Sequence, residues 1–113
     1  MLQHWTRDRE GTRIGIAEAV KALAAKPAKV AGLLDRGLLK AGYKSDLNVI
    51  DHAAVKLHVP TIIEDLPGGG RRLNQTAEGF VATIVAGQVI AENGKPTDAL
   101  PGRLVRGRQA EPA

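Results

Sequence analysis

The chain contains no cysteine and only three aromatic residues, one each of Trp, Tyr and Phe. Without cysteine, neither a disulfide nor a thiolate metal site can form within it. With so few rings, the core must be built from Ala, Val, Leu and Ile, and the aromatic platforms that stack on single-stranded nucleic acid are missing. The 16 basic residues exceed the 12 acidic ones, but no zinc-finger or RNA-binding motif accompanies them. We therefore expect no nucleic-acid partner.

Long hydrophobic runs are also absent, and no stretch approaches the length needed to cross a membrane. The opening segment, MLQHWTRDREG, carries charges where a signal peptide has an apolar run. We therefore expect a cytoplasmic protein that does not contact a membrane. Its 113 residues, 43% of them hydrophobic, are enough for one small folded domain.

The first part of the chain has a helical pattern. Between residues 14 and 25, apolar side chains recur every three or four positions and share one helical face: Ile16, Val20 and Leu23. Thr12 is the expected N-cap of this helix. Pro27 disfavours helix at Lys26 and suits the first turn of a second, short helix over residues 27–34, with Val30, Leu33 and Leu34 facing inward.

From residue 35 the pattern changes to short strands separated by glycine turns. Strands are expected at residues 38–39, 47–50, 55–59, 62–63, 80–85 and 89–91. The dipeptide Asn93-Gly94 predicts a tight hairpin turn, and residues 67–70 predict a loop. The fold class is therefore α+β, with a helical segment at residues 1–34, a β-rich segment at 35–107 and a disordered tail at 108–113.

Few residues suggest chemistry on their own. The three histidines, His4, His52 and His58, are not spaced as a metal-binding pair, so we expect no metal, no cofactor and no catalytic residue in this chain. Asp8 lies in a TRDR run and reads as a solvated charge, and Asp46 reads as a turn cap before its strand. One cluster is a candidate nest of backbone N–H groups for an anion, against the alternative of a simple hairpin loop: Gly68, Gly69, Gly70, Arg71 and Arg72.

Six motifs are spread along the chain. They are Pro27-Ala28 with Gly32-Leu33, Asp35-Arg36-Gly37, residues 41–51 (AGYKSDLNVID), 65–73 (DLPGGGRRL), Thr83 to Gly87 with Asn93-Gly94, and 100–107 (LPGRLVRG). Together they resemble the closing segment of N-acyl-D-amino-acid deacylases (D-aminoacylases) in the amidohydrolase superfamily. Ser45 departs from the pattern, since the family has a small Ala before the residue that matches Asp46.

The resemblance carries its own implications. Such enzymes have a catalytic barrel and a small β-sandwich built from both ends of the chain, so residues 1–34 would correspond to the last barrel helices and residues 35–107 to sandwich strands. The family's zinc ligands lie on earlier barrel strands, and its catalytic aspartate lies shortly before the residues that match His4 and Trp5. The resemblance thus makes His4, Trp5 and Arg7 candidates for a pocket rim.

The sequence leaves two interpretations open. In the first, the chain is the C-terminal part of a zinc-dependent enzyme that hydrolyses the amide bond of N-acyl-D-amino acids, and is inactive alone. Its partner would be the missing N-terminal portion or, without that portion, a second copy. In the second, the chain is a non-catalytic α+β interaction module that pairs with a partner through its strand edges.

Overall fold

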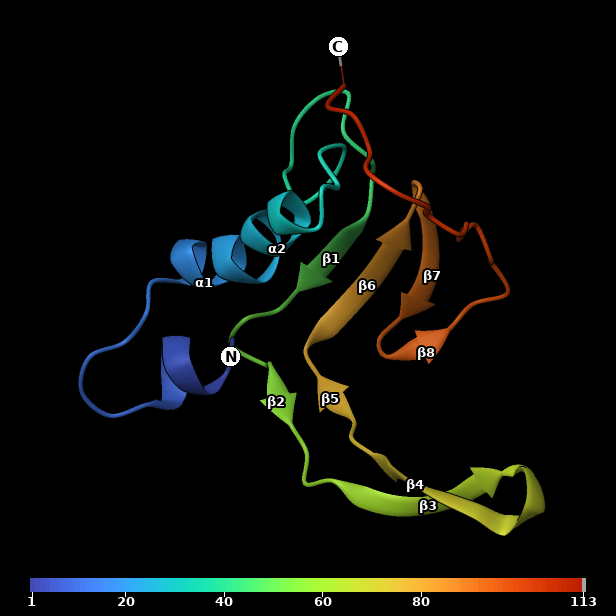
Figure 1. The fold of residues 1–113 in the computed structure, drawn as a ribbon. Helices are drawn as coiled ribbons and strands as arrows, with labels where there is room; N and C mark the ends of the chain where they lie inside the picture. The colour runs from blue at the N-terminus through green and yellow to red at the C-terminus, as the bar shows by residue number, and fades with distance from the viewer. Residues whose placement is uncertain (113) are drawn as a thin grey trace.

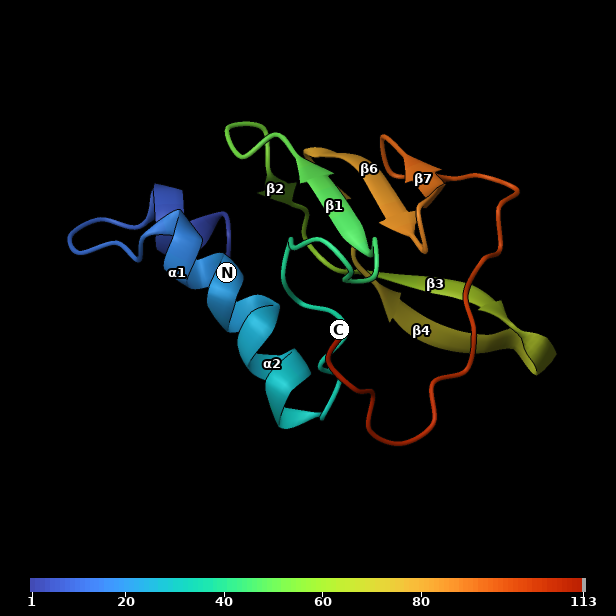
Figure 2. The ribbon, with the colours of Figure 1, turned by 90° about the horizontal axis from the view of Figure 1, so that it is seen from above.

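The computed structural model describes residues 1–112, which form a helical segment, a four-stranded sheet beside it and a β-ribbon that projects away (Figures 1 and 2). This arrangement confirms the α+β class. The elements in chain order are a π-helical turn η1 (His4–Asp8), α1 (Ile16–Leu23), α2 (Ala25–Val30), β1 (Leu47–Ile50), β2 (Lys56–Leu57), β3 (Thr61–Leu66), a 3-10 turn η2 (Pro67–Gly69), β4 (Gly70–Asn74), β5 (Ala77–Glu78), β6 (Phe80–Val85), β7 (Gln88–Glu92) and β8 (Lys95–Pro96).

The two helices form where the apolar pattern predicts them, but their boundaries differ. Gly15, and not Thr12, occupies the N-cap position of α1. The expected break at Lys26 is wrong, because α2 begins at Ala25 and includes both Lys26 and Pro27. Pro27 lies in the first turn, where a backbone N–H would have no partner within the helix, so the proline removes no hydrogen bond.

The second helix also ends earlier than expected, at Val30. Gly32 has φ +73°, its N–H donates to Lys29 O, and the next N–H, from Leu33, donates to Ala28 O. These two bonds form a Schellman motif, which stops a helix at a residue of positive φ. Val30, expected to face inward, is 89% exposed.

The main sheet has the antiparallel order β1-β6-β7-β8. In its register, Leu47 of β1 lies opposite Ile84 of β6, and Thr83 of β6 lies opposite Ala91 of β7. The strand patterns at 47–50, 80–85 and 89–91 are thereby confirmed. Both hairpin turns, Ala86-Gly87 and Asn93-Gly94, have positive φ at each residue, as a type I′ turn requires.

The expected strand at residues 38–39 does not form, and this segment is irregular. The extended pattern at 55–59 and 62–63 does form strands, although they are divided into β2 and β3. Strand β2 pairs with β5, and β3 pairs with β4, to give a long ribbon that projects away from the sheet (Figure 1). In the β3–β4 arm, Ile62 lies opposite Leu73, and both are mostly exposed.

The segment expected to be a disordered tail contacts the first half of the chain. Gln109 pairs with Leu33 in a parallel bridge, and the Tyr43 hydroxyl donates to Glu111 Oε1 over 2.9 Å. This bond to a carboxylate raises the pKa of Tyr43. The end of the chain therefore has contact partners of its own, far away in sequence, which a composition argument does not detect.

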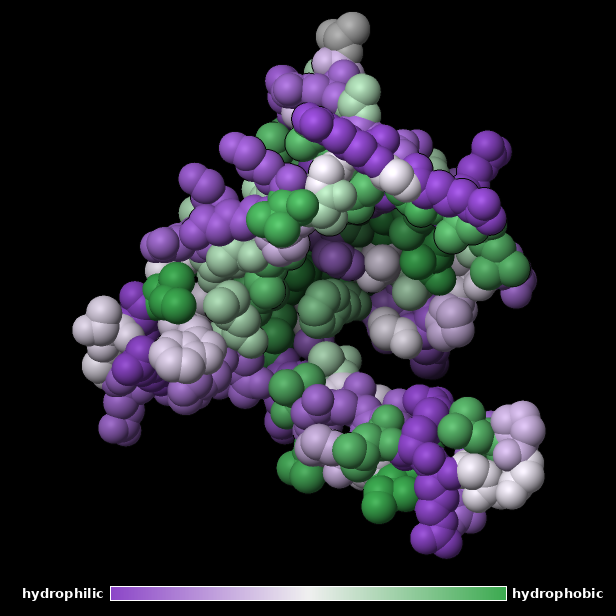
Figure 3. Space-filling model, viewed as in Figure 1, coloured by the Kyte–Doolittle hydropathy of each residue, from purple (hydrophilic) through white to green (hydrophobic). Residues whose placement is uncertain are grey.

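The core is very small. Among the described residues, only Ala19 and Val55 are buried hydrophobic side chains. Ile16, Val20 and Leu23, on the face that α1 should bury, are each about half exposed, at 48%, 47% and 50%. Figure 3 shows hydrophobic side chains at the surface, both over the helices and sheet and along the β3–β4 arm. No helix in the described part of the chain is long and apolar enough to cross a membrane.

Candidate functional site

Arg7 makes most of the side-chain hydrogen bonds that hold the N-terminal turn η1 against residues 52–55. Arg7 donates from Nη1 to the carbonyl oxygens of His52 and Ala53, each over 2.6 Å, and from Nη2 to that of Val55 over 2.7 Å. Its Nε donates to Asp8 Oδ1 over 2.6 Å, which raises the pKa of Arg7 and lowers that of Asp8 to about 2. Arg7 thus acts as a clamp between two segments that are far apart in sequence.

The other two residues proposed for a pocket rim take different positions. His4 packs edge-on against Trp5, with 5.4 Å between ring centroids, and the Arg9 guanidinium lies 4.6 Å from the Trp5 centroid. His4 also lines an apolar cleft of about 300 Å³ between η1, α1 and the ribbon, together with Leu23 and Phe80. Trp5 and Arg7 do not line it. The rim role of His4, Trp5 and Arg7 stays a prediction of the resemblance.

The histidines lie in separate places. His52 Nε2 is 2.7 Å from the Thr6 hydroxyl, and His58 Nε2 is 2.8 Å from Glu78 Oε1. Within residues 1–112, no three side chains of His, Cys, Asp or Glu come together in a way that could hold a metal ion. The donor set that the structure describes does not fit a zinc site, so we assign no zinc-dependent step to these residues.

The candidate anion nest forms the tip of the β3–β4 arm. Gly68 and Gly69 both have positive φ, at 71° and 73°, and make a tight turn. Arg72 donates from Nε and Nη2 to Asp65 over 2.8 and 2.6 Å, and this bond raises its pKa. Arg71 pairs with Glu64 at 2.7 Å. Both guanidinium groups therefore already bind carboxylates on the opposite strand. The nest also stays a prediction.

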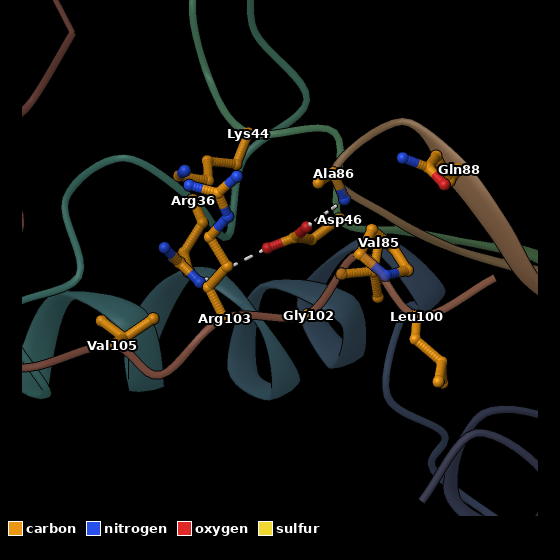
Figure 4. Close-up of a pocket in the computed structure, with 11 residues that line it drawn as sticks. Arg36, Lys44, Asp46, Val85, Ala86, Gln88, Leu100, Gly102, Arg103 and Val105 are labelled. Atoms are coloured by element: carbon orange, nitrogen blue, oxygen red, sulfur yellow. Dashed lines mark hydrogen bonds and ion pairs between the residues drawn. The ribbon is translucent and has the colours of Figure 1, made fainter.

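A larger cavity, of about 490 Å³, lies where the β6–β7 turn meets the segment after β8 (Figure 4). Asp46 lies at its centre: Oδ1 accepts the Ala86 N–H over 2.9 Å, and Oδ2 is 3.4 Å from Arg36 Nη1. The first bond holds the left-handed Ala86 of the β6–β7 turn in place, which is a different turn from the one before β1 that Asp46 is predicted to cap. Lys44 and Arg103 also line the cavity.

Sequence reasoning missed this cavity. Arg36, Asp46 and Arg103 come from three segments, and no spacing rule connects residues so far apart. The only signal was that Arg36, Asp46 and Arg103 each lie in one of the six motifs.

Neither the curated proteins nor the solved structures contain a match to this chain. The model of the family described as "Amidohydrolase family" matches residues 1–91, which covers the helices, the ribbon and most of the main sheet. Because this match spans well over half of the chain, the protein described here belongs to the amidohydrolase family.

Proposed function

We propose that the chain is the closing, non-catalytic part of a zinc-dependent amidohydrolase that hydrolyses the amide bond of N-acyl-D-amino acids. The family match supports the hydrolase class. The D-aminoacylase type and its zinc rest on the resemblance of the motifs at residues 65–73 and 100–107. In this proposal, the zinc ligands and the catalytic carboxylate belong to the rest of the enzyme.

The observation that carries the proposal is the amount of exposed surface. The chain exposes 8631 Å², whereas a folded monomer of 11.9 kDa exposes about 5,950 Å². The excess is about 2,700 Å², larger than one partner contributes to most stable interfaces. The radius of gyration, 16.5 Å, also exceeds the value of about 13 Å typical for this length. A chain with this much excess surface is expected to pack against further protein.

The exposed apolar residues show which faces need cover. On α1 they are Ile16, Val20 and Leu23, beside the apolar cleft that Leu23 shares with Phe80. In the family, a helix at this position packs on the catalytic barrel, so this face would be the contact with the barrel. The family match does not favour the alternative of a freestanding interaction module.

The proposal is tested on the gene. The DNA upstream of residue 1 is translated in phase and searched for His-x-His and SD-x-G segments. The whole reading frame is then expressed, and its zinc content and its hydrolysis of N-acetyl-D-amino acids are compared with hydrolysis of the L-enantiomers. We expect about one or two zinc ions per chain, because amidohydrolase-type water activation needs a bound metal, and a preference for the D-form. A reading frame without these segments would overturn the proposal.

A matched pair of variants in the whole enzyme tests the barrel contact. Val20→Asp places a charge on the exposed α1 face, and we expect it to weaken the assembly and the activity. Val30→Asp is the control, because it places the same charge on α2, outside the α1 face and the lining of the apolar cleft, and it should behave like the wild type. If both variants behaved like the wild type, the α1 face would not be the contact.

A further inference from the structure

We propose that the 490 Å³ cavity around Asp46 binds a small carboxylate that carries an apolar body. Three cationic side chains from separate segments line this cavity: Arg36, Lys44 and Arg103. The lining contains a single acidic residue, Asp46. Figure 4 shows the three cationic groups gathered on one side of Asp46, with Val85 and Leu100 on the other.

The charges in and around the cavity do not balance. Arg36 is compensated twice, since its Nε and Nη2 donate to Asp35 over 2.9 and 3.1 Å and its Nη1 lies 3.4 Å from Asp46. Among residues 1–112, neither Lys44 nor Arg103 has a carboxylate within ion-pair distance. Arg103 therefore faces this space without an ion-pair partner, and Lys44 has only a longer-range attraction to Asp35. Positive charges that gather in a recess raise its affinity for anions.

The lining also indicates which kind of anion fits. Arginine presents a planar fork of N–H donors that matches a carboxylate. Val85, Leu100 and Val105 add apolar surface to the lining, and Leu100 is 92% exposed. The cavity volume is in the range of small-molecule sites, which exceeds what a bare inorganic ion would fill. These features together favour a carboxylate attached to an aliphatic chain, such as hexanoate.

Ligand binding at this site does not depend on the activity of the proposed enzyme, because residues of this chain alone line the cavity. An inactive or metal-free whole enzyme would leave this inference intact. Failure of binding here would in turn leave the proposed function intact.

The test is an NMR titration of the 113-residue chain, labelled with ¹⁵N, at constant ionic strength. Hexanoate, acetate, inorganic phosphate and hexanol are added in separate series. We expect saturable shifts of the Lys44 and Ala86 amide signals with hexanoate, weaker shifts with acetate, and none with hexanol. Arg103→Gln should weaken hexanoate binding roughly tenfold or more, the value of one lost charge-assisted hydrogen bond.

The control is Arg106→Gln, which removes the same charge from the same segment but outside the cavity lining. It should bind hexanoate like the wild type, and the ¹⁵N spectrum of each variant reports whether the fold is kept. If both variants weakened hexanoate binding equally, the net charge of the chain would explain the effect, and the proposed site would be overturned. Equal binding of hexanol would overturn the role of the cations, and equal or tighter binding of phosphate would overturn the choice of a carboxylate. Absence of any saturable shift with hexanoate would overturn the proposal altogether.

Discussion

Gly79→Ala should be one of the most damaging single substitutions in this chain. Gly79 joins the ribbon to the main sheet, between β5 and β6, with φ +87°. Its carbonyl accepts the Asp51 N–H over 2.9 Å. An added Cβ would lie 2.6 Å from Val55 N, 2.7 Å from Val55 Cα and 2.9 Å from Ala54 C. Val55 is one of the two buried hydrophobic residues among those described, so the added Cβ would clash with the backbone of a core residue.

Two costs add up at this position. The left-handed conformation costs an alanine about 1–2 kcal/mol. Relieving the contact requires backbone at Ala54 and Val55 to move by several tenths of an ångström, and overpacking of this kind costs about 1–3 kcal/mol. We therefore expect Gly79→Ala to lower the free energy of unfolding by about 2–5 kcal/mol.

Gly94→Ala is the matched control. Gly94 has a similar φ, +77°, but no atom lies within 4 Å of its Cβ position. It should lose only the conformational part, about 1–2 kcal/mol. The assay is urea unfolding followed by circular dichroism, with ¹⁵N spectra to count the folded fraction if Gly79→Ala is unfolded in water. If Gly79→Ala lost no more stability than Gly94→Ala, the close approach of Gly79 to Val55 would be refuted.

Two further predictions concern charge and exposure. Because Arg7 and Gln3 hydrogen-bond its carboxylate, the Asp8 pKa is lowered to about 2, so its contribution to stability is present above pH 3.8 and is lost as the pH falls toward 2. A carboxyl ¹³C titration of Asp8 with a midpoint at or above 3.8 would contradict this. Replacing Ile62, which is 67% exposed on the arm, by Lys should reduce self-association in a light-scattering concentration series more than Val30→Lys does. Equal behaviour of the two variants would exclude the arm as a contact.

Local signals in the sequence predicted the parts of the fold that depend on a few neighbouring residues. Alternating apolar residues located β6, short apolar runs located β1 and β7, and Asn93-Gly94 located the last tight turn. These signals work because side-chain patterns and positive φ are properties of short segments. The apolar spacing in residues 16–23 located α1 for the same reason.

Two features that the sequence did not reveal depend on residues far apart in the chain. The Arg7 clamp needs three carbonyls that face one guanidinium across more than 40 residues of sequence. The cavity needs Arg36, Asp46 and Arg103 to meet. Neither arrangement follows a helical or strand period, so no window of sequence contains it. The start of α2 at Ala25 was missed for a local reason, since proline in a first helical turn is compatible with helix on both sides of it.

The chain has well-formed local structure but almost no hydrophobic core of its own. Its turns and ion pairs are well formed: Arg72 binds Asp65 through two nitrogens, and two type I′ turns close the main sheet. Yet a two-stranded ribbon is only marginally stable in water by itself, and exposed ion pairs add little. The hydrophobic stabilisation that a chain of this length needs must therefore come from surface that is still exposed here. On this reasoning, covering the α1 face and the arm should raise the stability of the chain more than any substitution within its own small core.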